Sequence, residues 1–152
     1  MTRRKSSVPM FDNRPTIMIV DDDEVAVMAV RRAIKRHGLP NPTVEARDGL
    51  EALERLRAGI RRPYLILLDI NMPRMTGLEL LATIRADDEL TDSVVFIMTT
   101  SDSPRDVSEA YRLHAAGYIR KEEAYRSISE AVSMLDVYFG LVTLPTETGV
   151  AR

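Results

Sequence analysis

Cysteine is absent from this sequence of 152 residues. Its absence excludes disulfide bonds, thiolate nucleophiles, iron–sulfur clusters and zinc sites built on thiolates. We therefore expect a protein of the reducing cytoplasm. The first 15 residues include Arg3, Arg4 and Lys5, but no apolar run follows them, so they lack the core of a signal peptide. We expect neither export nor a membrane anchor.

An excess of charge of one sign is also missing. The chain has 21 Lys and Arg residues against 23 Asp and Glu residues, which gives a formal net charge of -2. No overall field therefore attracts nucleic acid or an anionic membrane surface, and we expect neither as a partner.

Glycine-rich phosphate-binding motifs are missing as well. The 7 glycines match neither the G-x-G-x-x-G pattern nor the P-loop spacing. A nucleotide or flavin binder, which is one alternative for an α/β protein, is therefore disfavoured. The 2 histidines, His37 and His114, are too few to hold zinc by themselves, and we expect both to be solvated residues near helix ends.

The sequence does contain an alternation of short apolar runs with longer amphipathic segments. Apolar and β-branched residues predict strands at 16–20, 43–46, 64–68, 94–98 and 117–120. Spacing and capping residues predict helices at about 24–37, after Asp48, from Thr76 to about Arg85, after Ser103 and at about 122–139. In the second helix we expect an inner stripe of Leu50, Leu53 and Leu56.

This alternation predicts a doubly wound α/β fold. Parallel strands need crossover connections, and the intervening helices supply them on both faces of a five-stranded sheet. Ligands of such sheets bind outside the carboxyl ends of the strands. We expect residues 15–139 to form the domain, with a flexible N-terminal arm at 1–14 and an apolar C-terminal arm and tail at 140–152.

Polar side chains follow four of the predicted strands where each strand ends. Asp21 and Asp22 follow the first strand, Asp69 the third, Thr99 the fourth and Lys121 the fifth. Crowded carboxylates repel one another unless a cation joins them, and an all-oxygen donor set favours Mg²⁺. Each residue alone has an ordinary structural interpretation, such as a strand threonine or a solvated lysine. Their joint placement predicts a phosphoryl site, with Asp69 best placed as the nucleophile.

The residues at these strand ends resemble those of a known family. The segments are Ile19-Val20-Asp21-Asp22, Leu67-Leu68-Asp69-Ile70-Asn71-Met72-Pro73 with Gly77, Met98-Thr99 and Tyr118-Ile119-Arg120-Lys121. Together they look like the receiver domain of bacterial two-component response regulators, and the resemblance extends over residues 16–139. It implies a flavodoxin-like sheet with strand order 2-1-3-4-5.

The resemblance also implies roles for individual residues. Asp69 would accept a phosphoryl group from a sensor histidine kinase. Asp22 and Asp69 would hold Mg²⁺ directly, with the backbone carbonyl of Asn71 as third protein ligand and Asp21 acting through water. Lys121 would contact the phosphoryl oxygens.

Further positions of the family pattern concern the switch and its timing. Thr99 would move toward the phosphoryl group, and Tyr118, at the aromatic switch position, would turn inward with it. Asn71 and Ser101 would tune the lifetime of the phosphorylated state. The resemblance thus implies a signalling protein that is not an enzyme beyond its own phosphorylation and dephosphorylation.

One position departs from the family pattern. The family normally has proline after the lysine, in a cis peptide bond, whereas this chain has Glu122. A non-proline cis bond costs roughly 2.5–4 kcal/mol, so the loop is either trans and altered or strained. We expect phosphorylation with changed kinetics. A receiver-like protein that signals only by binding, with weak phosphorylation, is the alternative.

The end of the chain suggests how the protein acts. We expect no effector domain after the last helix, so the output would be the surface of the receiver itself. An apolar run continues past that helix, in Val137, Tyr138, Phe139, Leu141, Val142 and Leu144. Exposed apolar patches commonly mark interfaces, and packing back on the sheet is the alternative. The run resembles the stand-alone regulators that partner bacterial phytochromes, which implies a homodimer and a light-sensing kinase such as a bacteriophytochrome.

An aspartate-nucleophile phosphatase is the enzyme alternative. It too places a carboxylate after a strand beside Mg²⁺. That family needs a second aspartate two residues after the nucleophile as acid and base, and position 71 here is asparagine.

Overall fold

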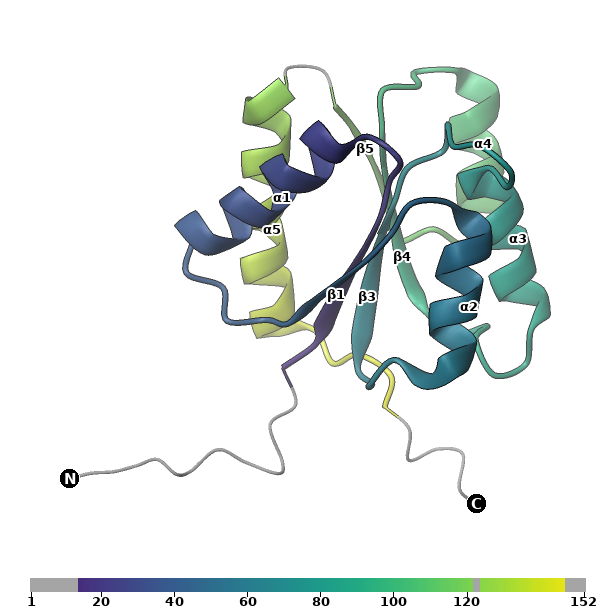
Figure 1. Ribbon diagram of the computed structural model, residues 1–152, viewed down its shortest axis with the longest axis horizontal. Coiled ribbons are helices and arrows are strands. Elements are labelled where there is room, and N and C mark those ends of the chain that lie inside the picture. Colours follow the sequence, from purple (N-terminus) through teal and green to yellow (C-terminus); the bar gives the residue numbers. More distant parts are fainter. Residues whose placement is uncertain (1–13, 122–123, 147–152) are drawn as a thin grey trace.

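The computed structural model describes residues 14–121 and 124–146, and these form one sheet with helices on both sides (Figure 1). All strand pairs are parallel, in the order β2-β1-β3-β4-β5, which confirms the predicted fold. The five strands are β1 (Thr16–Val20), β2 (Thr43–Ala46), β3 (Tyr64–Leu68), β4 (Val94–Thr99) and β5 (Gly117–Arg120). Residues 1–13 of the expected N-terminal arm, residues 147–152 and Glu122 lie outside the described residues.

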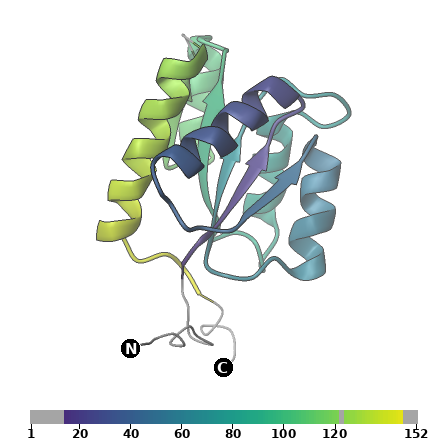
Figure 2. The same ribbon diagram turned by 60° about the vertical axis from the view of Figure 1, so that its left-hand side comes forward.

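Two layers of helices cover the two faces of the sheet (Figure 2). The five helices are α1 (Glu24–Arg36), α2 (Gly49–Gly59), α3 (Gly77–Ala86), α4 (Pro104–Arg112) and α5 (Ala124–Leu141). Side chains of α1 and α5 share one core cluster with one face of the strands. Side chains of α2, α3 and α4 share the other cluster with the opposite face. Each inner strand is therefore covered on both sides.

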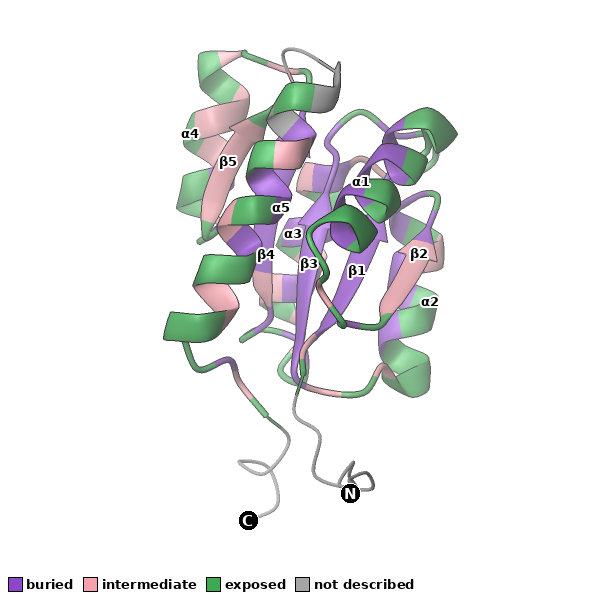
Figure 3. Ribbon diagram, turned by 90° about the vertical axis from the view of Figure 1, so that its left-hand side faces the viewer, coloured by how far each residue is buried: buried purple, intermediate pink, exposed green. Residues whose placement is uncertain are grey.

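Burial explains why the inner strands are apolar throughout. Every residue of β1 and β3 is buried, whereas the edge strands β2 and β5 are partly exposed (Figure 3). A strand that is covered on both faces has no solvent side, so its sequence shows no alternation of apolar and polar residues. The carboxyl ends of these inner strands therefore lie side by side at the centre of one end of the sheet.

Each of the first four helices begins at a side-chain cap, and the sequence predicted those at Asp48, Thr76 and Ser103. Asp23, Asp48 and Ser103 each accept a backbone N–H of the first turn, and Thr76 forms a full capping box with Glu79. These caps satisfy donors that the start of a helix leaves without a partner inside the helix. The caps also fix the residue at which each helix begins, after the loop that follows the carboxyl end of the preceding strand.

The predicted inner stripe of α2 was wrong at Leu50, which is 43% exposed. The buried positions are Gly49, Ala52, Leu53 and Leu56, which follow the i, i+3, i+4, i+7 spacing of one helix face. Because Asp48 is the cap, Gly49 is the first helical residue and faces the core. Leu50 is then turned about 100° away from that face.

The C-terminal apolar run divides into buried and exposed residues. Leu144 is buried in the cluster shared by α1 and α5, and Tyr138 and Phe139 pack partly against it. Val137, Leu141 and Val142 remain 61%, 79% and 40% exposed. Part of the run therefore packs on its own chain, and α5 includes Leu141, the second residue of the expected arm.

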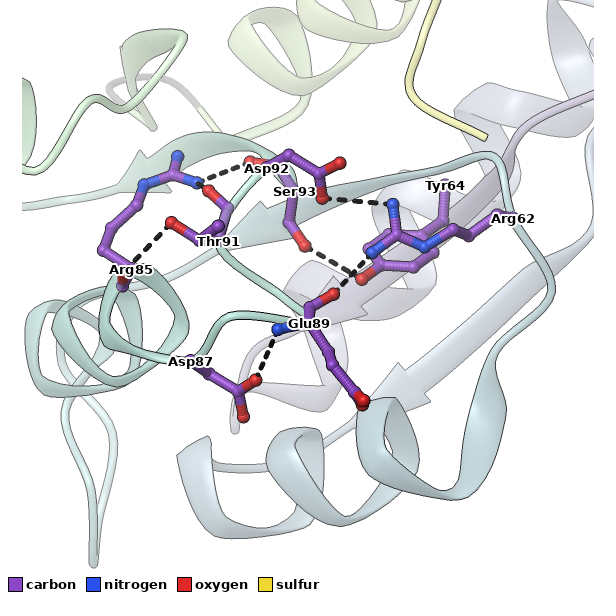
Figure 4. Close-up of polar contacts among 8 residues, drawn as sticks. All are labelled: Arg62, Tyr64, Arg85, Asp87, Glu89, Thr91, Asp92 and Ser93. Carbon is purple, nitrogen blue, oxygen red and sulfur yellow. Dashed lines mark hydrogen bonds and ion pairs between the residues drawn. The ribbon is translucent and has the colours of Figure 1, made fainter. Parts of the chain in front are cut away.

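A polar network ties the amino ends of β3 and β4 to the loops around them (Figure 4). Its members are Arg62, Tyr64, Arg85, Glu89, Thr91, Asp92 and Ser93, which we call the amino-end network. The Arg62 guanidinium pairs with the Asp92 carboxylate at 3.1 Å and lies 5.3 Å from the centre of the Tyr64 ring. The Tyr64 and Ser93 hydroxyls are hydrogen-bonded at 2.8 Å.

Arg85 has the largest number of partners in the amino-end network. Its guanidinium donates to the backbone carbonyls of Leu113, Thr91, Ser93 and His114 at 2.6–2.9 Å. One side chain thus joins α3 to the start of β4 and to the turn before β5.

Among the described residues, no helix is both long enough and apolar enough to cross a bilayer.

Candidate functional site

Three carboxylates meet at the opposite edge of the sheet, where β1 and β3 end. These strands pair in register from Thr16 with Tyr64 to Val20 with Leu68, and the Asp69 N–H donates to the Val20 carbonyl at 2.9 Å. Asp21, Asp22 and Asp69 therefore follow adjacent strand ends. Each offers one carboxylate oxygen, and these three oxygens lie within 4.8 Å of one another.

Burial sets the electrostatics of the three carboxylates. Asp69 and Asp21 are 7% and 5% exposed, whereas Asp22 is exposed to solvent. Burial raises the pKa of Asp69, and the nearby charge of Asp21 raises it further. Lys121, the Thr99 hydroxyl and the Ile70 N–H act in the opposite direction without cancelling the effect. A further positive charge at this edge would relieve the conflict.

Lys121 reaches this cluster from the end of β5. Its Nζ lies 2.8 Å from Oδ2 of Asp21, and both side chains are less than a tenth exposed. Its backbone N–H donates to the Thr99 carbonyl at 2.8 Å, which fixes the main chain from which the side chain extends. The lysine thus faces the acids as the sequence predicts, and its ammonium group pairs with Asp21.

Thr99 ends β4 beside the cluster and connects it to the start of α4. Thr99 is fully buried, and its Oγ1 accepts the Ser101 N–H at 3.4 Å. The Ser101 hydroxyl donates to Asp106 of α4 at 2.6 Å. The Tyr118 hydroxyl donates to the Ser101 carbonyl at 2.9 Å, so residues 99, 101 and 118 form one hydrogen-bonded chain.

The loop between β3 and α3 passes over the site. Asn71 lies in this loop and is exposed, whereas Ile70 and Met72 on either side of it are buried. A Cβ at Gly77 would overlap the backbone carbonyl of Asp69, so only glycine lets the loop return this close to the acceptor position. The Gly77 N–H donates to the Ile70 carbonyl at 2.9 Å and closes the loop.

Two contacts near the site have no signal in the sequence. Arg74 adopts a left-handed backbone conformation with φ 66° and pairs with Asp48, for which the sequence predicted only a helix cap. Asp106, in the first turn of α4, holds the Ser101 hydroxyl. Both join residues from different elements, and such pairs depend on how loops fold over the sheet.

The fold and this site together define a receiver of the two-component type. The family model described as "Response regulator receiver domain" matches residues 17–133, so the chain belongs to that family. Among curated proteins, it is 31% identical over 135 residues to the response regulator Rcp1 of Synechocystis, covering 85% of this chain and 92% of Rcp1. It is also 31% identical over 127 residues to a probable methanogenesis regulatory protein, FilR2, of Methanothrix harundinacea, covering 81% and 82% of the two chains.

Solved structures give the same assignment. The phosphorylated cyanobacterial phytochrome response regulator RcpA has 32% identity and a TM-score of 0.80, covering 88% of this chain and 99% of RcpA. The Mn(2+)-bound form of Rcp1 has 30% identity and a TM-score of 0.78, covering 87% of this chain and 99% of Rcp1. This chain is therefore a receiver-domain response regulator similar to Rcp1 and RcpA.

Proposed function

We propose that this protein accepts a phosphoryl group on Asp69 from a sensor histidine kinase, and that it signals through its own phosphorylation-dependent surface. The observation that carries the proposal is the gathering of the Asp21, Asp22 and Asp69 carboxylates within 4.8 Å, beside the buried Lys121 and Thr99 side chains. RcpA, which shares this fold, has been crystallised in a phosphorylated form. On this proposal the protein is no enzyme except toward its own phosphoryl group.

A divalent cation fits the donors at this site. All three side chains offer oxygen. Burial and then the charge of Asp21 raise the pKa of Asp69, and Lys121 does not cancel the effect. We assign Mg²⁺ to Asp22 and Asp69, with the Asn71 backbone carbonyl as third ligand and Asp21 acting through water. The Mn(2+)-bound form of Rcp1 supports a divalent ion in this family. When bound, the ion supplies positive charge that offsets the charge of carboxylate and phosphoryl oxygens.

The chemical step is an in-line displacement at phosphorus. A carboxylate oxygen of Asp69 attacks the phosphorus of a phosphohistidine, the P–N bond breaks, and the leaving imidazole nitrogen takes up a proton. Lys121 donates to the phosphoryl oxygens. In the later dephosphorylation, water attacks the phosphorus of the aspartyl phosphate, the P–O bond to Asp69 breaks, and inorganic phosphate leaves.

Thr99 and Tyr118 form the switch in this proposal. The Thr99 hydroxyl donates to a phosphoryl oxygen, and the motion passes through Ser101 to the Tyr118 hydroxyl along the hydrogen bonds already described. The phosphoryl group shifts the population only by binding one arrangement better, and a full reversal from 1:99 needs about 5.5 kcal/mol. Asn71 and Ser101, two residues beyond Asp69 and Thr99, tune how long the phosphoryl group survives.

Acetyl phosphate tests the acceptor directly. Incubation with acetyl phosphate and Mg²⁺ should add the mass of one phosphoryl group to the wild-type protein and none to Asp69→Asn. Asp23→Asn is the matched control, because asparagine retains the α1 cap and position 23 lies outside the carboxylate cluster. Labelling that survives Asp69→Asn, or that is unaffected by chelation of Mg²⁺, would refute the proposal.

We further propose a bacteriophytochrome-type kinase as the phosphoryl donor, with the reaction in the cytoplasm. The support is the similarity to RcpA, which is described as a phytochrome response regulator. Transfer from a phosphorylated bacteriophytochrome kinase should be at least 10-fold faster than transfer from an unrelated histidine kinase. Equal rates from the two kinases would remove the phytochrome assignment.

We also propose a homodimer formed through α5 and the C-terminal arm. In this proposal residues 1–14 are an N-terminal arm, residues 15–139 form the receiver domain, and residues 140–152 form the C-terminal arm and tail. The support is the exposure of Val137, Leu141 and Val142 on and after the end of α5. Sedimentation should give a dimer for the wild type and a monomer for Val137→Glu. Val25→Glu on α1 is the control, since both valines are 61% exposed. A monomeric wild type would exclude this interface.

A further inference from the structure

Arg74 holds a backbone conformation that arginine rarely adopts. Its φ is 66°, in the left-handed region that glycine enters without a steric cost, and it lies in the loop that joins β3 to α3. His114 is the other described non-glycine residue with positive φ, and it lies at the amino end of β5, away from the carboxylates. An observed backbone outlier next to a site is grounds for asking what its side chain contributes.

The Arg74 side chain binds the cap of the neighbouring helix. Its Nε and one terminal nitrogen lie 2.8 and 2.7 Å from Oδ2 of Asp48. The other oxygen of Asp48 accepts the Glu51 N–H at 2.9 Å and thereby caps α2. The Asp48 side chain is only 9% exposed, which shields the ion pair from solvent on one side. The pKa of Asp48 is lowered, chiefly by the Glu51 N–H, with Arg74 contributing in the same direction.

A second contact holds the same loop against α2. The Met75 side chain rests on Gly49, where a Cβ would lie 2.6 Å from Cγ of Met75. Two consecutive loop residues, Arg74 and Met75, therefore rest on the first turn of α2. Asn71, whose carbonyl we assign to the cation, lies three residues before Arg74, and Pro73 stiffens the segment between them.

We propose that Arg74 is a positioning residue for the divalent cation, acting through its ion pair with Asp48. The pair fixes the β3–α3 loop against α2, so that the Asn71 backbone is held in place before a cation arrives. The inference rests on the proposed function, because it presupposes a cation bound by Asp22, Asp69 and Asn71. Arg74 itself contacts neither the cation nor the phosphoryl group.

A glycine substitution at position 74 distinguishes the contribution of the Arg74 side chain from that of its backbone conformation. Arg74→Gly retains a residue suited to positive φ and removes the ion pair. Isothermal titration of the full chain with Mn²⁺ and with Mg²⁺ should show dissociation constants about 10-fold weaker than in the wild type, in the range usual for groups that orient metal ligands. Arg74→Lys keeps the charge without the fork and should recover part of the affinity. His114→Gly, which relieves the same strain elsewhere, should bind as the wild type does.

Asp48→Asn tests the partner. Asparagine still caps α2, so the fold is retained while the ion pair is lost, and the cation affinity should fall as it does in Arg74→Gly. The double variant should be no weaker than either single variant, because both remove one interaction. Urea unfolding of each variant shows whether it is folded at the titration temperature.

The outcomes separate this inference from the proposed function. Wild-type affinity in Arg74→Gly, or an equal loss in His114→Gly, would overturn the role of the ion pair while Asp69 remains the acceptor. Cation binding that is lost in Asp69→Asn but kept in Arg74→Gly would overturn it in the same way. A wild-type protein that binds neither Mn²⁺ nor Mg²⁺ would overturn both.

Discussion

The two ends of the sheet treat buried charge in opposite ways. At the carboxyl ends, burial raises the pKa of Asp69 and a second buried carboxylate, Asp21, raises it further. At the amino ends, burial lowers the pKa of Arg85, yet its guanidinium donates to four backbone carbonyls. One end keeps an electrostatic conflict that a ligand can relieve, and the other provides partners within the protein. We therefore expect the amino end to contribute mainly to stability and the carboxyl end to carry the proposed chemistry.

The largest effect is expected from the amino end. Arg85→Ala removes four hydrogen bonds from a charged donor and should lower the free energy of unfolding by about 3 kcal/mol, allowing for water at the exposed carbonyls. Urea unfolding measures the change. Arg112→Ala, whose side chain is 70% exposed and pairs with Glu109, is the control and should cost less than about 0.5 kcal/mol. A loss below about 1 kcal/mol for Arg85→Ala would show that the amino-end network is not a major source of stability.

Phosphorylation of folded Arg85→Ala tests whether the two ends of the sheet are independent. At low temperature, where the variant is folded, acetyl phosphate should label Asp69 as fast as it does in the wild type. A slower rate in fully folded protein would mean that the two ends are coupled through β3 and β4.

Gly77→Ala, at the carboxyl end, should lower both the stability of the protein and the rate of phosphorylation. The added methyl group overlaps the Asp69 carbonyl, so the loop or the acceptor residue must move, at a cost of about 2 kcal/mol. Labelling of Asp69 should slow as well. Gly140→Ala is the control: a Cβ there meets nothing within 4 Å, and alanine in a helix should add about 0.5–1 kcal/mol. Normal labelling of a destabilised Gly77→Ala would show that the loop moves while the acceptor does not.

A smaller effect of opposite sign is expected at Asp69. Because the folded state raises the pKa of Asp69, its contribution to stability is greatest below the unfolded pKa and falls as pH rises through the folded pKa. Asp69→Asn should therefore increase the free energy of unfolding at neutral pH by about 0.5–2 kcal/mol when divalent ions are chelated. The gain should disappear in acid, which urea unfolding across pH measures. A lower free energy of unfolding for Asp69→Asn at neutral pH would contradict the inference that the buried Asp69 charge destabilises the fold.

The fold could be predicted because its strongest signals are local. All five strands and helices occur where apolar runs, caps and spacing predicted them, since a strand covered on both faces must be apolar throughout. The strand ends then bring Asp21, Asp69 and Lys121 together by topology alone. Leu50 was misplaced because Leu53 and Leu56 share their helix face with Gly49, and the next residue, Leu50, is turned about 100° away from that face.

The contacts that could not be predicted join residues from different elements through loops. The Arg74–Asp48 pair depends on the left-handed backbone conformation of Arg74. An arginine in the sequence gives no signal for that conformation. Leu144 returns to the core after α5 has ended, although its neighbours Leu141 and Val142 are exposed. Composition and spacing carry no information on which residue of a loop faces inward, because that depends on surfaces supplied by distant segments.

The path of the described chain also has a practical consequence. It enters the sheet at the amino end of β1. Its last described residue, Thr146, lines a hollow together with Tyr64, which begins β3. A strand of five residues spans roughly 17 Å, and Asp69 lies beyond the far end of β3. A fluorescent reporter joined at residue 14 or at residue 146 would thus begin about a sheet's length from the acids, which suits this scaffold to imaging in living cells.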